Sequence, residues 1–405
     1  MTTNSKVLFN DLFFARLYYF TFMGGWGFIL PFMNLFYISL GFNGKQVGLI
    51  SSTSAIVGMV ASPLWVSEVK KHPRARRILQ IALVLGAFGY YIIGSQASFL
   101  FILMLVFLHS LAASGILPLS DSMAVMVAEE SGNGYGSVRV WASLGWIISL
   151  LSSGWPVARF GFIAAFIGVG MMWLVAAAVV LFIRPRFFSH AHQVDRPRPN
   201  LRLALQRVRQ DRTLLGFAVA LLAIGFLNSG VLQFENVFLA ELGASRQLIS
   251  VAGILSAVVE IPFMIYTDRI VRRVGAHRLM LLALTMTIFQ RLAVFSLPFI
   301  ATIMIVRFLG GVAFSFYTIT FIGLISSRTE ASETGTVLAL FSITIAGLVS
   351  IIAAPVAGTL FDALGARWLY GLSAGGYVIG VLCLWWTKPE TIHARSLLQQ
   401  TDSVL

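Results

Sequence analysis

Twelve long apolar segments constrain the fold of this chain more than any other feature of its sequence. Apolar runs of about 18 or more residues are typical of helices that cross the hydrocarbon core of a membrane. The segments cover residues 12–40, 47–69, 78–95, 99–127, 137–158, 162–183, 213–240, 248–267, 277–296, 299–327, 334–360 and 367–387. Only 11% of the 405 residues are charged, too few to cover the surface of a soluble protein of this size. We therefore predict an all-α membrane protein with twelve transmembrane helices.

A strongly basic segment, residues 184–212, divides the apolar segments into two sets of six. It holds eight arginines against two aspartates, and both flanking halves are apolar. An even division of this kind is typical of duplicated transporters whose binding site lies between the halves. We predict two pseudo-symmetric six-helix bundles, residues 1–183 and 213–390. A cytoplasmic linker over 184–212 joins them, and a cytoplasmic tail covers 391–405.

The second half of the linker has the spacing of an amphipathic helix. Leu201, Leu205 and Val208 share one helical face, and Asn200 can cap the N-terminus of the helix. A basic amphipathic helix is typical of the membrane surface, so we predict one that lies on the inner surface and tethers the two halves. A solvated linker is the alternative.

Lysine and arginine are distributed unevenly between the two faces of the predicted helix array. Twenty-three of the 29 fall on the face that holds the termini, against four on the other: Lys45, Arg159, Arg246 and Arg367. Basic loops are enriched on the cytoplasmic side, so we predict a multi-pass protein of the cytoplasmic (inner) membrane with both termini in the cytoplasm. Because these charges lie in short loops beside apolar segments, the net charge of +13 does not indicate nucleic-acid binding.

The two halves also repeat each other in register. Residues 40–47 (LGFNGKQV) correspond to residues 242–248 (LGASRQL), where the second predicted helix of each half begins. Pro63 and Pro262 follow at similar depths in those two helices. Parallel repeats of this kind predict a transporter built from two equivalent bundles.

Three patches of sequence resemble the major facilitator superfamily of transporters. Residues 268–278 (DRIVRRVGAHR) are similar to its Asp-Arg…Gly-Arg-Arg loop signature. Residues 118–122 (PLSDS) and 135–146 (YGSVRVWASLGW) resemble a Pro-Leu-x-Asp…Tyr-Gly-x-Val-Arg-x-Trp-Gly-Ser pattern. That pattern belongs to the branch of phenylpropionate permease and nucleoside–proton symporter-like proteins, which are relatives of lactose permease. The resemblance implies secondary transport, usually proton-coupled import of a small organic molecule such as an aromatic or other organic acid.

The same patches hold two candidate conformational latches. The first is centred on Asp268, which ends a predicted helix and is followed by Arg269, Arg272, Arg273, Gly275 and Arg278. An acid in this place can pair with nearby cations and separate from them again. The alternative is ordinary charge that sets membrane topology. The equivalent loop of the first half is degenerate, with Glu68 in the acidic place and no glycine.

Asp121 and Arg139 form the second candidate latch. Asp121 lies near the inner end of segment 99–127, and Arg139 begins the next predicted helix at that same end. We predict an ion pair that either closes the cytoplasmic side as a gate or braces the two helices.

Four ionisable residues interrupt the apolar segments of the second half: Glu235, Glu260, Arg291 and Arg307. A charge at the bilayer centre costs roughly 2.5–3.5 kcal/mol on insertion scales, so these side chains should face a wet cavity or one another. Glu235 and Arg291 lie at matching depths, which predicts a pair. Glu260 is predicted to carry the proton, with Glu235 as the second proton-coupling candidate. Arg291 or Arg307 would supply a competing cation or hold an anionic substrate group. Static pairs that only fix helix packing are the alternative.

Four further residues are candidates for the substrate site: Asn228, Trp26, Asn34 and His109. Asn228 shares a helical face with Glu235, which follows seven residues later. Packing explains the aromatic residues of the first helix equally well, and a hydrogen-bonded core histidine is the alternative for His109.

The remaining features argue against an enzyme. The six histidines are scattered, the single cysteine provides no intramolecular disulfide, and no phosphate-cradling loop for ATP is present. We predict a monomeric secondary active transporter that works by alternating access in the lipid bilayer, with the proton gradient as its energy source and no metal or cofactor. Proton-coupled import is the first prediction, and efflux of a small amphipathic molecule is the alternative. A non-transporting sensor or a membrane-embedded enzyme is the alternative from another class.

Overall fold

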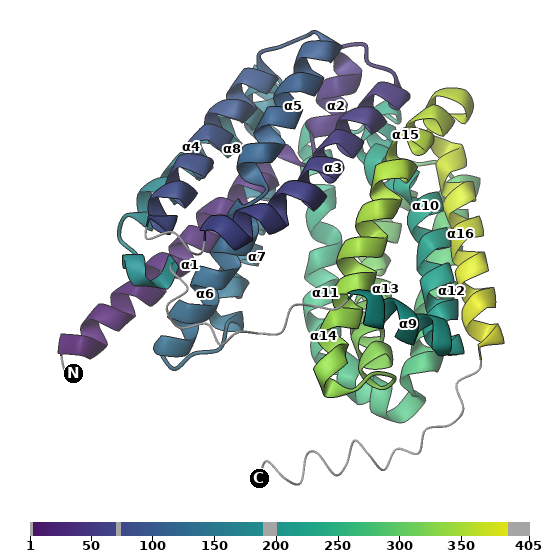
Figure 1. Cartoon of the computed structure of the whole chain (residues 1–405). Coiled ribbons are helices and arrows are strands. Elements are labelled where there is room, and N and C mark those ends of the chain that lie inside the picture. Colours follow the sequence, from purple (N-terminus) through teal and green to yellow (C-terminus); the bar gives the residue numbers. More distant parts are fainter. Residues whose placement is uncertain (1–2, 70–73, 189–200, 388–405) are drawn as a thin grey trace.

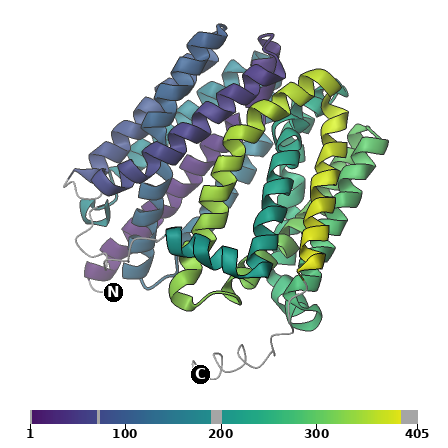
Figure 2. The same ribbon diagram turned by 45° about the vertical axis from the view of Figure 1, so that its right-hand side comes forward.

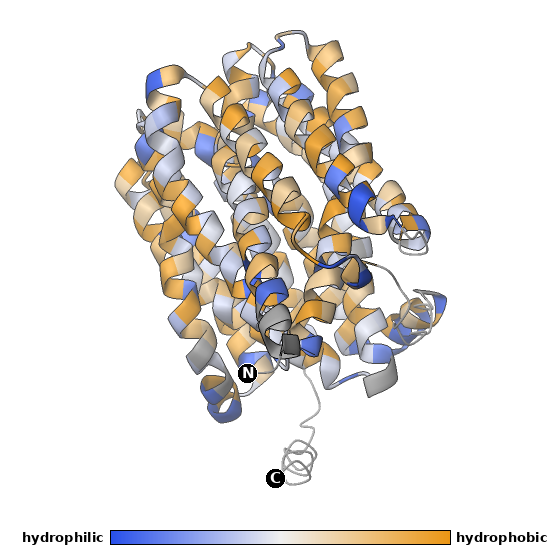
Figure 3. Ribbon diagram, turned by 90° about the vertical axis from the view of Figure 1, so that its left-hand side faces the viewer, coloured by the Kyte–Doolittle hydropathy of each residue, from blue (hydrophilic) through white to orange (hydrophobic). Residues whose placement is uncertain are grey.

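The computed structural model describes residues 3–69, 74–188 and 201–387. Within these ranges, twelve helical spans are long and apolar enough to cross a membrane, so the predicted number of transmembrane helices is confirmed. Figure 3 shows hydrophobic residues along the length of the helices. The protein is a multi-pass, all-α membrane protein.

The N-terminal half contains the first six spans, and the first of them packs mainly against the fifth and sixth (Figure 1). Its elements are α1 (Thr3–Ile29), α2 (Met33–Ser39), α3 (Gly44–Val69), α4 (Ala75–Gly94), α5 (Phe99–Ala113), α6 (Ile116–Glu130), α7 (Gly136–Phe160), α8 (Ile163–Val180) and the 3-10 turn η1 (Pro185–Phe188). α1 and α2 together form the first span, and α5 and α6 form the fourth.

The C-terminal half repeats this arrangement. Its elements are α9 (Leu201–Gln210), α10 (Arg212–Glu241), α11 (Arg246–Val274), α12 (Ala276–Ser296), α13 (Ile300–Ser326), α14 (Ala331–Ala339), the π-helical segment η2 (Leu340–Ile345), α15 (Ala346–Leu364) and α16 (Ala366–Trp386). α14, η2 and α15 together form the eleventh span.

The two ends of the bundle differ in charge, and we name them accordingly. α1 begins and α16 ends at the same end, which also carries the arginine-rich helix α9 and the α11–α12 connection (Figure 1). We call this the basic end. The opposite end, where α2 leads into α3 and α10 leads into α11, is the far end.

A glycine contact and a large aromatic residue illustrate the close packing of the N-terminal half. A Cβ at Gly145 of α7 would overlap the carbonyl oxygen of Phe20, so only glycine lets α7 approach α1 this closely. Trp173 of α8 is 1% exposed and donates its indole N–H to the carbonyl of Phe22 at 3.2 Å. The polar end of the indole is thereby satisfied while its rings fill the core.

The predicted internal repeat reappears as paired turns at the far end. Gly41 follows α2 with φ +85°, and Gly243 follows α10 with φ +88°. Gly161 and Gly365 likewise end α7 and α15 with φ +82° and +81°. A positive φ favours glycine because it has no Cβ to clash with the following carbonyl. The same turn chemistry therefore closes equivalent helices in both halves.

The linker helix forms where the sequence predicts it, but with a different buried face. Val208 is 3% exposed as expected, whereas Leu205 is 42% exposed and Ala204, at 4%, takes its place in the core. The small side chain of Ala204 lets α9 lie closely against α10 and α14 of the C-terminal half. Figures 1 and 2 show α9 lying across the basic end of that half. The proposed cap Asn200 and the tail 391–405 lie outside the described residues.

Polar contacts fix α9 to the C-terminal half. The guanidinium of Arg207 donates to the carbonyl of Arg328 at 3.3 Å. Arg328 in turn pairs with Asp211 at 3.8 Å, and Asp211 caps α10 by accepting from the backbone N–H groups of Thr213 and Leu214. The helix α9 is therefore attached to the C-terminal half, whereas Arg184 at the start of the linker pairs with Asp11 of α1 in the N-terminal half.

Candidate functional site

A cavity of about 820 Å³ lies inside the C-terminal half. Helices α10 to α13, the segment η2–α15 and α16 supply its walls, and it extends from the level of Glu235 toward Phe321 and Phe341, nearer the basic end. Its charged and amide side chains are Asn228, Glu235, Glu260, Gln290, Arg291 and Arg307. The four ionisable residues singled out in the sequence therefore converge on one space, together with Asn228.

The ion pair in this cavity joins Glu235 and Arg307. The Nε of Arg307 lies 3.2 Å from Oε1 of Glu235, and the two side chains are 15% and 17% exposed. A terminal nitrogen of Arg307 also donates to Oδ1 of Asn236 at 2.7 Å. The prediction that Glu235 pairs with Arg291 is therefore wrong. Matching depth places two residues at one height, but their directions around the helix axes decide which side chains meet.

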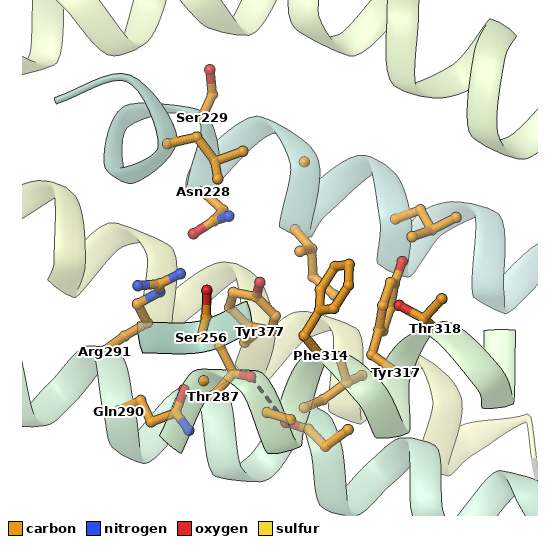
Figure 4. A pocket seen from close by; sticks show the side chains of 18 of the residues that line it. Asn228, Ser229, Ser256, Thr287, Gln290, Arg291, Phe314, Tyr317, Thr318 and Tyr377 are labelled. Carbon is orange, nitrogen blue, oxygen red and sulfur yellow. Dashed lines mark hydrogen bonds between the residues drawn. The ribbon is translucent and has the colours of Figure 1, made fainter. Parts of the chain in front are cut away.

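Arg291 faces the cavity without a carboxylate partner in the described structure. Its guanidinium carbon lies 5.7 Å from the centre of the Tyr370 ring, and its buried Nε makes no hydrogen bond. Figure 4 shows Arg291 and Asn228 directed toward each other across the cavity. Asn228 is held by the hydroxyl of Ser373, which donates to its Oδ1 at 2.7 Å. A planar guanidinium with free donors can bind a carboxylate in two-pronged fashion.

Glu260 is held by its backbone. Its carbonyl accepts a hydrogen bond from the Ser315 hydroxyl at 3.0 Å. A Cβ at Gly311 would overlap the carbonyl oxygen of Ser256 and lie 3.0 Å from the Glu260 nitrogen, so glycine permits close α11–α13 packing here. The Glu260 carboxylate makes no ion pair with any described residue. In this conformation, then, neither cavity arginine neutralises Glu260.

The three N-terminal candidates do not line this cavity. Asn34 donates instead to the backbone carbonyl of Gln233 at 2.7 Å, across the boundary between the halves. Trp26 packs against Phe22 at 5.2 Å between ring centres. His109 lies 4.3 Å from the Tyr90 ring, and its buried Nδ1 has no hydrogen-bond partner in the described structure. It is a core histidine, but not a fully hydrogen-bonded one.

The two halves are sealed together at the far end by α3 and α15. Both carboxylate oxygens of Asp362 accept from the N-terminus of α3, from the N–H of Gly44 at 2.6 Å and of Lys45 at 2.9 Å. Further along, a Cβ at Gly48 would overlap the backbone of Ala354, so the helices touch directly. The carboxylate is favoured here because a helix N-terminus carries unpaired N–H donors and a partial positive charge.

A second, pseudo-equivalent contact seals the far end between α7 and α11. Arg246 donates to the carbonyl of Val157 at 2.7 Å, near the C-terminus of α7, where cations are favoured. The hydroxyls of Ser153 and Ser250 lie 2.9 Å apart. Throughout the described residues, every hydrogen bond between the halves lies nearer the far end. The halves diverge from there toward the basic end in both Figure 1 and Figure 2.

We expect Asp362→Ala to loosen the far-end seal. Loss of a helix-capping side chain costs about 1 kcal/mol, which corresponds to about fivefold greater opening. The reporter is the alkylation rate of a cysteine placed at Ala354, which is 4% exposed, in a Cys383→Ser background.

Ser245→Ala is the matched control for this prediction. Ser245 caps α11 at the same end by accepting from Leu248 N–H at 3.2 Å, but this bond stays within one half. An equal increase in alkylation for Ser245→Ala and Asp362→Ala would contradict the assignment of Asp362 to the seal.

The Asp121–Arg139 latch has different partners from those predicted. Oδ1 of Asp121 accepts from the hydroxyls of Tyr19 at 2.5 Å and Tyr135 at 2.9 Å. Arg139 is exposed and forms no ion pair with Asp121 in the described structure. Tyr135, in the α6–α7 connection, reaches Asp121 before the first turn of α7 carries Arg139 outward. Burial and the Asp121 carboxylate raise the pKa of Tyr135, so its hydroxyl stays a donor at neutral pH.

The predicted ion pairs of Asp268 stay a prediction, because the side chain of Asp268 is not among the described ones. Gly275 ends α11 with φ +88°, which accounts for the glycine of the motif. The guanidinium of Arg269 lies 5.8 Å from the Tyr266 ring centre, and the other arginines of the loop, Arg272, Arg273 and Arg278, are exposed.

Three further functional candidates are not predicted from the sequence: Asn236, Asp362 and Tyr370. Tyr370 is buried, and the centre of its ring lies 5.7 Å from the guanidinium carbon of Arg291. The only feature of the sequence that could have indicated Asn236 is its position directly after Glu235. Asp362 lies in the last turn of α15, just before the turn at Gly365, a place where polar residues are ordinary.

Comparison with known proteins finds relatives over most of the chain. Residues 13–372 match the MFS_1 like family. A maltose permease of Geobacillus stearothermophilus is 31% identical over 271 residues, which cover 66% of this chain and 66% of the permease, just under two thirds of its length. A probable 3-phenylpropionic acid transporter of Escherichia coli (strain K12) is 24% identical over 271 residues, covering 65% of this chain and 69% of that protein. The crystal structure of the nucleoside transporter NupG shares the fold, with a TM-score of 0.78 at 17% identity, over 94% of this chain and 100% of that chain.

Proposed function

This chain belongs to the MFS_1 like family and is a membrane transporter of the major facilitator type, and from that premise we propose that it imports a small organic acid together with a proton. The observation that carries the proposal is the cavity of the C-terminal half, which combines one closed ion pair with one arginine and one glutamate that form no ion pair with any described residue. The protein works by alternating access, in the cytoplasmic membrane, with its basic end in the cytoplasm.

The distribution of contacts supports alternating access. A transporter of this kind must expose its site to one side while the other side is closed. Here the halves are held together near the far end by Asp362 and Arg246, and they diverge toward the basic end. With the basic end in the cytoplasm, as the arrangement of Lys and Arg favours, this is an inward-facing conformation. In this proposal, residues 1–183 and 213–390 form the two bundles that move against each other, and residues 184–212 form the basic linker between them.

The charges of the cavity support coupling between a proton and an anion. Glu235 and Arg307 neutralise each other, which leaves Arg291 and Glu260. Protonation of Glu260 leaves the positive charge of Arg291 uncompensated, and a carboxylate solute then restores neutrality. A neutral cavity is cheaper to enclose in a membrane than a charged one. The proton and the organic anion therefore favour each other's binding.

Uptake into proteoliposomes with an imposed inward proton gradient tests this proposal. A panel of labelled aromatic acids, aliphatic acids, sugars and nucleosides covers the chemistry in the names of the relatives. We expect accumulation of an organic acid that a protonophore collapses and Arg291→Gln removes. Accumulation of a sugar or nucleoside alone would overturn the organic-acid assignment. If the inward proton gradient instead drives preloaded solute out of the proteoliposomes, efflux in exchange for protons is favoured.

A further inference from the structure

A chain of polar contacts leads out of the cavity and ends in the other half of the molecule. Glu235 pairs with Arg307, and Arg307 donates to Oδ1 of Asn236 at 2.7 Å. Nδ2 of Asn236 then donates to the backbone carbonyl of Pro31 at 3.1 Å. Glu235 and Asn236 lie on α10, Arg307 on α13, and Pro31 between α1 and α2. These three contacts therefore connect the ion pair to the N-terminal half.

The end point of this chain is a break in the first span. α1 ends at Ile29 and α2 begins at Met33, with Pro31 between them. Proline has no N–H and its ring disfavours a continuous helix, so backbone carbonyls near it lose helical partners. Asn236 supplies a donor to one of these carbonyls from across the boundary between the halves. The contact lies on the far-end side, where the halves must separate if the cavity is to open there.

The chemistry of the neighbours fixes the orientation of the Asn236 amide. Arg307 has only donors, so it must face the amide oxygen, and the Pro31 carbonyl has only acceptors, so it must face the amide nitrogen. If Arg307 moves, the oxygen loses its partner and nothing on that side holds the amide in this orientation. The strength of the contact to Pro31 therefore depends on where the guanidinium lies.

We propose that Asn236 is a positioning residue that couples the Glu235–Arg307 ion pair to the far-end seal. While the pair is closed, Arg307 orients Asn236 and α10 stays attached to the break at Pro31. When Glu235 is neutralised or Arg307 is drawn to a bound solute, the amide is released and the far end is free to open. This inference rests on the proposed alternating access, but it needs neither the organic acid nor the role of Glu260.

A neighbouring hydrogen bond provides a matched control. Asn34 donates to the Gln233 carbonyl at 2.7 Å, so it also joins α2 to α10 across the same boundary. Its bond ends on a backbone carbonyl, and within the described structure no hydrogen bond joins Asn34 to Arg307. Both asparagines therefore contribute one bond to the seal, and only Asn236 links that bond to the ion pair.

A double-mutant cycle tests the coupling. The readout is alkylation of a cysteine at position 354, in the full chain with Cys383→Ser, so no solute is required. Glu235→Gln alone and Asn236→Ala alone should each raise the rate about fivefold, the factor for one net hydrogen bond. In the Asn236→Ala background, Glu235→Gln should add less than about twofold, because the link is already broken. In the Asn34→Ala background it should keep its full effect.

Equal effects of Glu235→Gln in the two asparagine backgrounds would overturn the coupling role of Asn236. If Asn236→Ala does not fold, Asn236→Asp replaces it, because it keeps an acceptor for Arg307 and loses the donor to Pro31. A fast alkylation rate that no longer responds to Glu235→Gln supports the proposal, and a retained response contradicts it. If proton-driven uptake is absent but the mutant cycle is non-additive, the proposed function is refuted and the coupling role of Asn236 stands.

Discussion

Glu260→Gln is expected to abolish accumulation of solute against its gradient while leaving solute exchange intact. Glutamine keeps the size and polarity of glutamate but cannot bind and release a proton. One proton and one carboxylate together carry no net charge, so the pH gradient alone drives their joint entry. Each pH unit then supplies about 1.4 kcal/mol, which corresponds to about a tenfold concentration ratio. In the variant this ratio should fall to about one. Proteoliposomes with an imposed pH gradient measure it directly, and counterflow without a gradient measures exchange.

Glu241→Gln is the matched control for this variant. Glu241 ends α10 at the far end and does not line the cavity. It should leave accumulation unchanged. If Glu260→Gln retains proton-driven accumulation, Glu260 is not the proton carrier, and Glu235 becomes the remaining carboxylate of the cavity.

Arg307→Met is expected to produce the largest loss of stability. It leaves Glu235 with no cation in contact inside the C-terminal half, although the side chain of Glu235 is only 17% exposed. Removal of one member of a buried ion pair costs about 3–5 kcal/mol. We expect a marked fall in the melting temperature of the purified protein in detergent, followed by size-exclusion chromatography. Glu235→Gln in the same chain should recover much of the loss, because no buried charge then remains unpaired.

Arg291→Met distinguishes a paired arginine from an unpaired one in the same cavity. Arg291 forms no ion pair with a described residue, so its removal breaks no direct contact between opposite charges. Its effect on melting temperature should be much smaller than that of Arg307→Met. Equal losses for the two variants, or no recovery by Glu235→Gln, would show that side-chain volume rather than charge pairing determines these stabilities.

The twelve spans could be predicted from the sequence because membrane insertion depends on local apolar length. Each span is long enough to be read on its own, and the basic segment 184–212 marks the boundary between the halves. The linker helix was predicted in the right place with partly the wrong face. Leu205 is more apolar than Ala204, but the close approach of α9 to its neighbours selects the smaller side chain for the core.

The candidate site could be predicted less completely. A charge within an apolar segment is expensive in lipid, so the convergence of Glu260 and Arg307 on a cavity follows from the sequence. Which charges touch depends on helix rotation, and this is why Arg307 rather than Arg291 meets Glu235. The contacts of Asn236 to Pro31 lie across the boundary between the halves, at 205 residues' separation. No local pattern encodes such a contact.

The most direct test of the account is a measurement of proton movement with solute in proteoliposomes that contain a trapped pH-sensitive dye. The solute is the one identified by uptake, added outside without an imposed proton gradient. Proton-coupled import predicts acidification of the lumen that depends on the solute and is lost in Glu260→Gln. Solute entry without any change in dye signal would contradict proton coupling, and alkalinisation of the lumen would establish exchange of solute for protons instead.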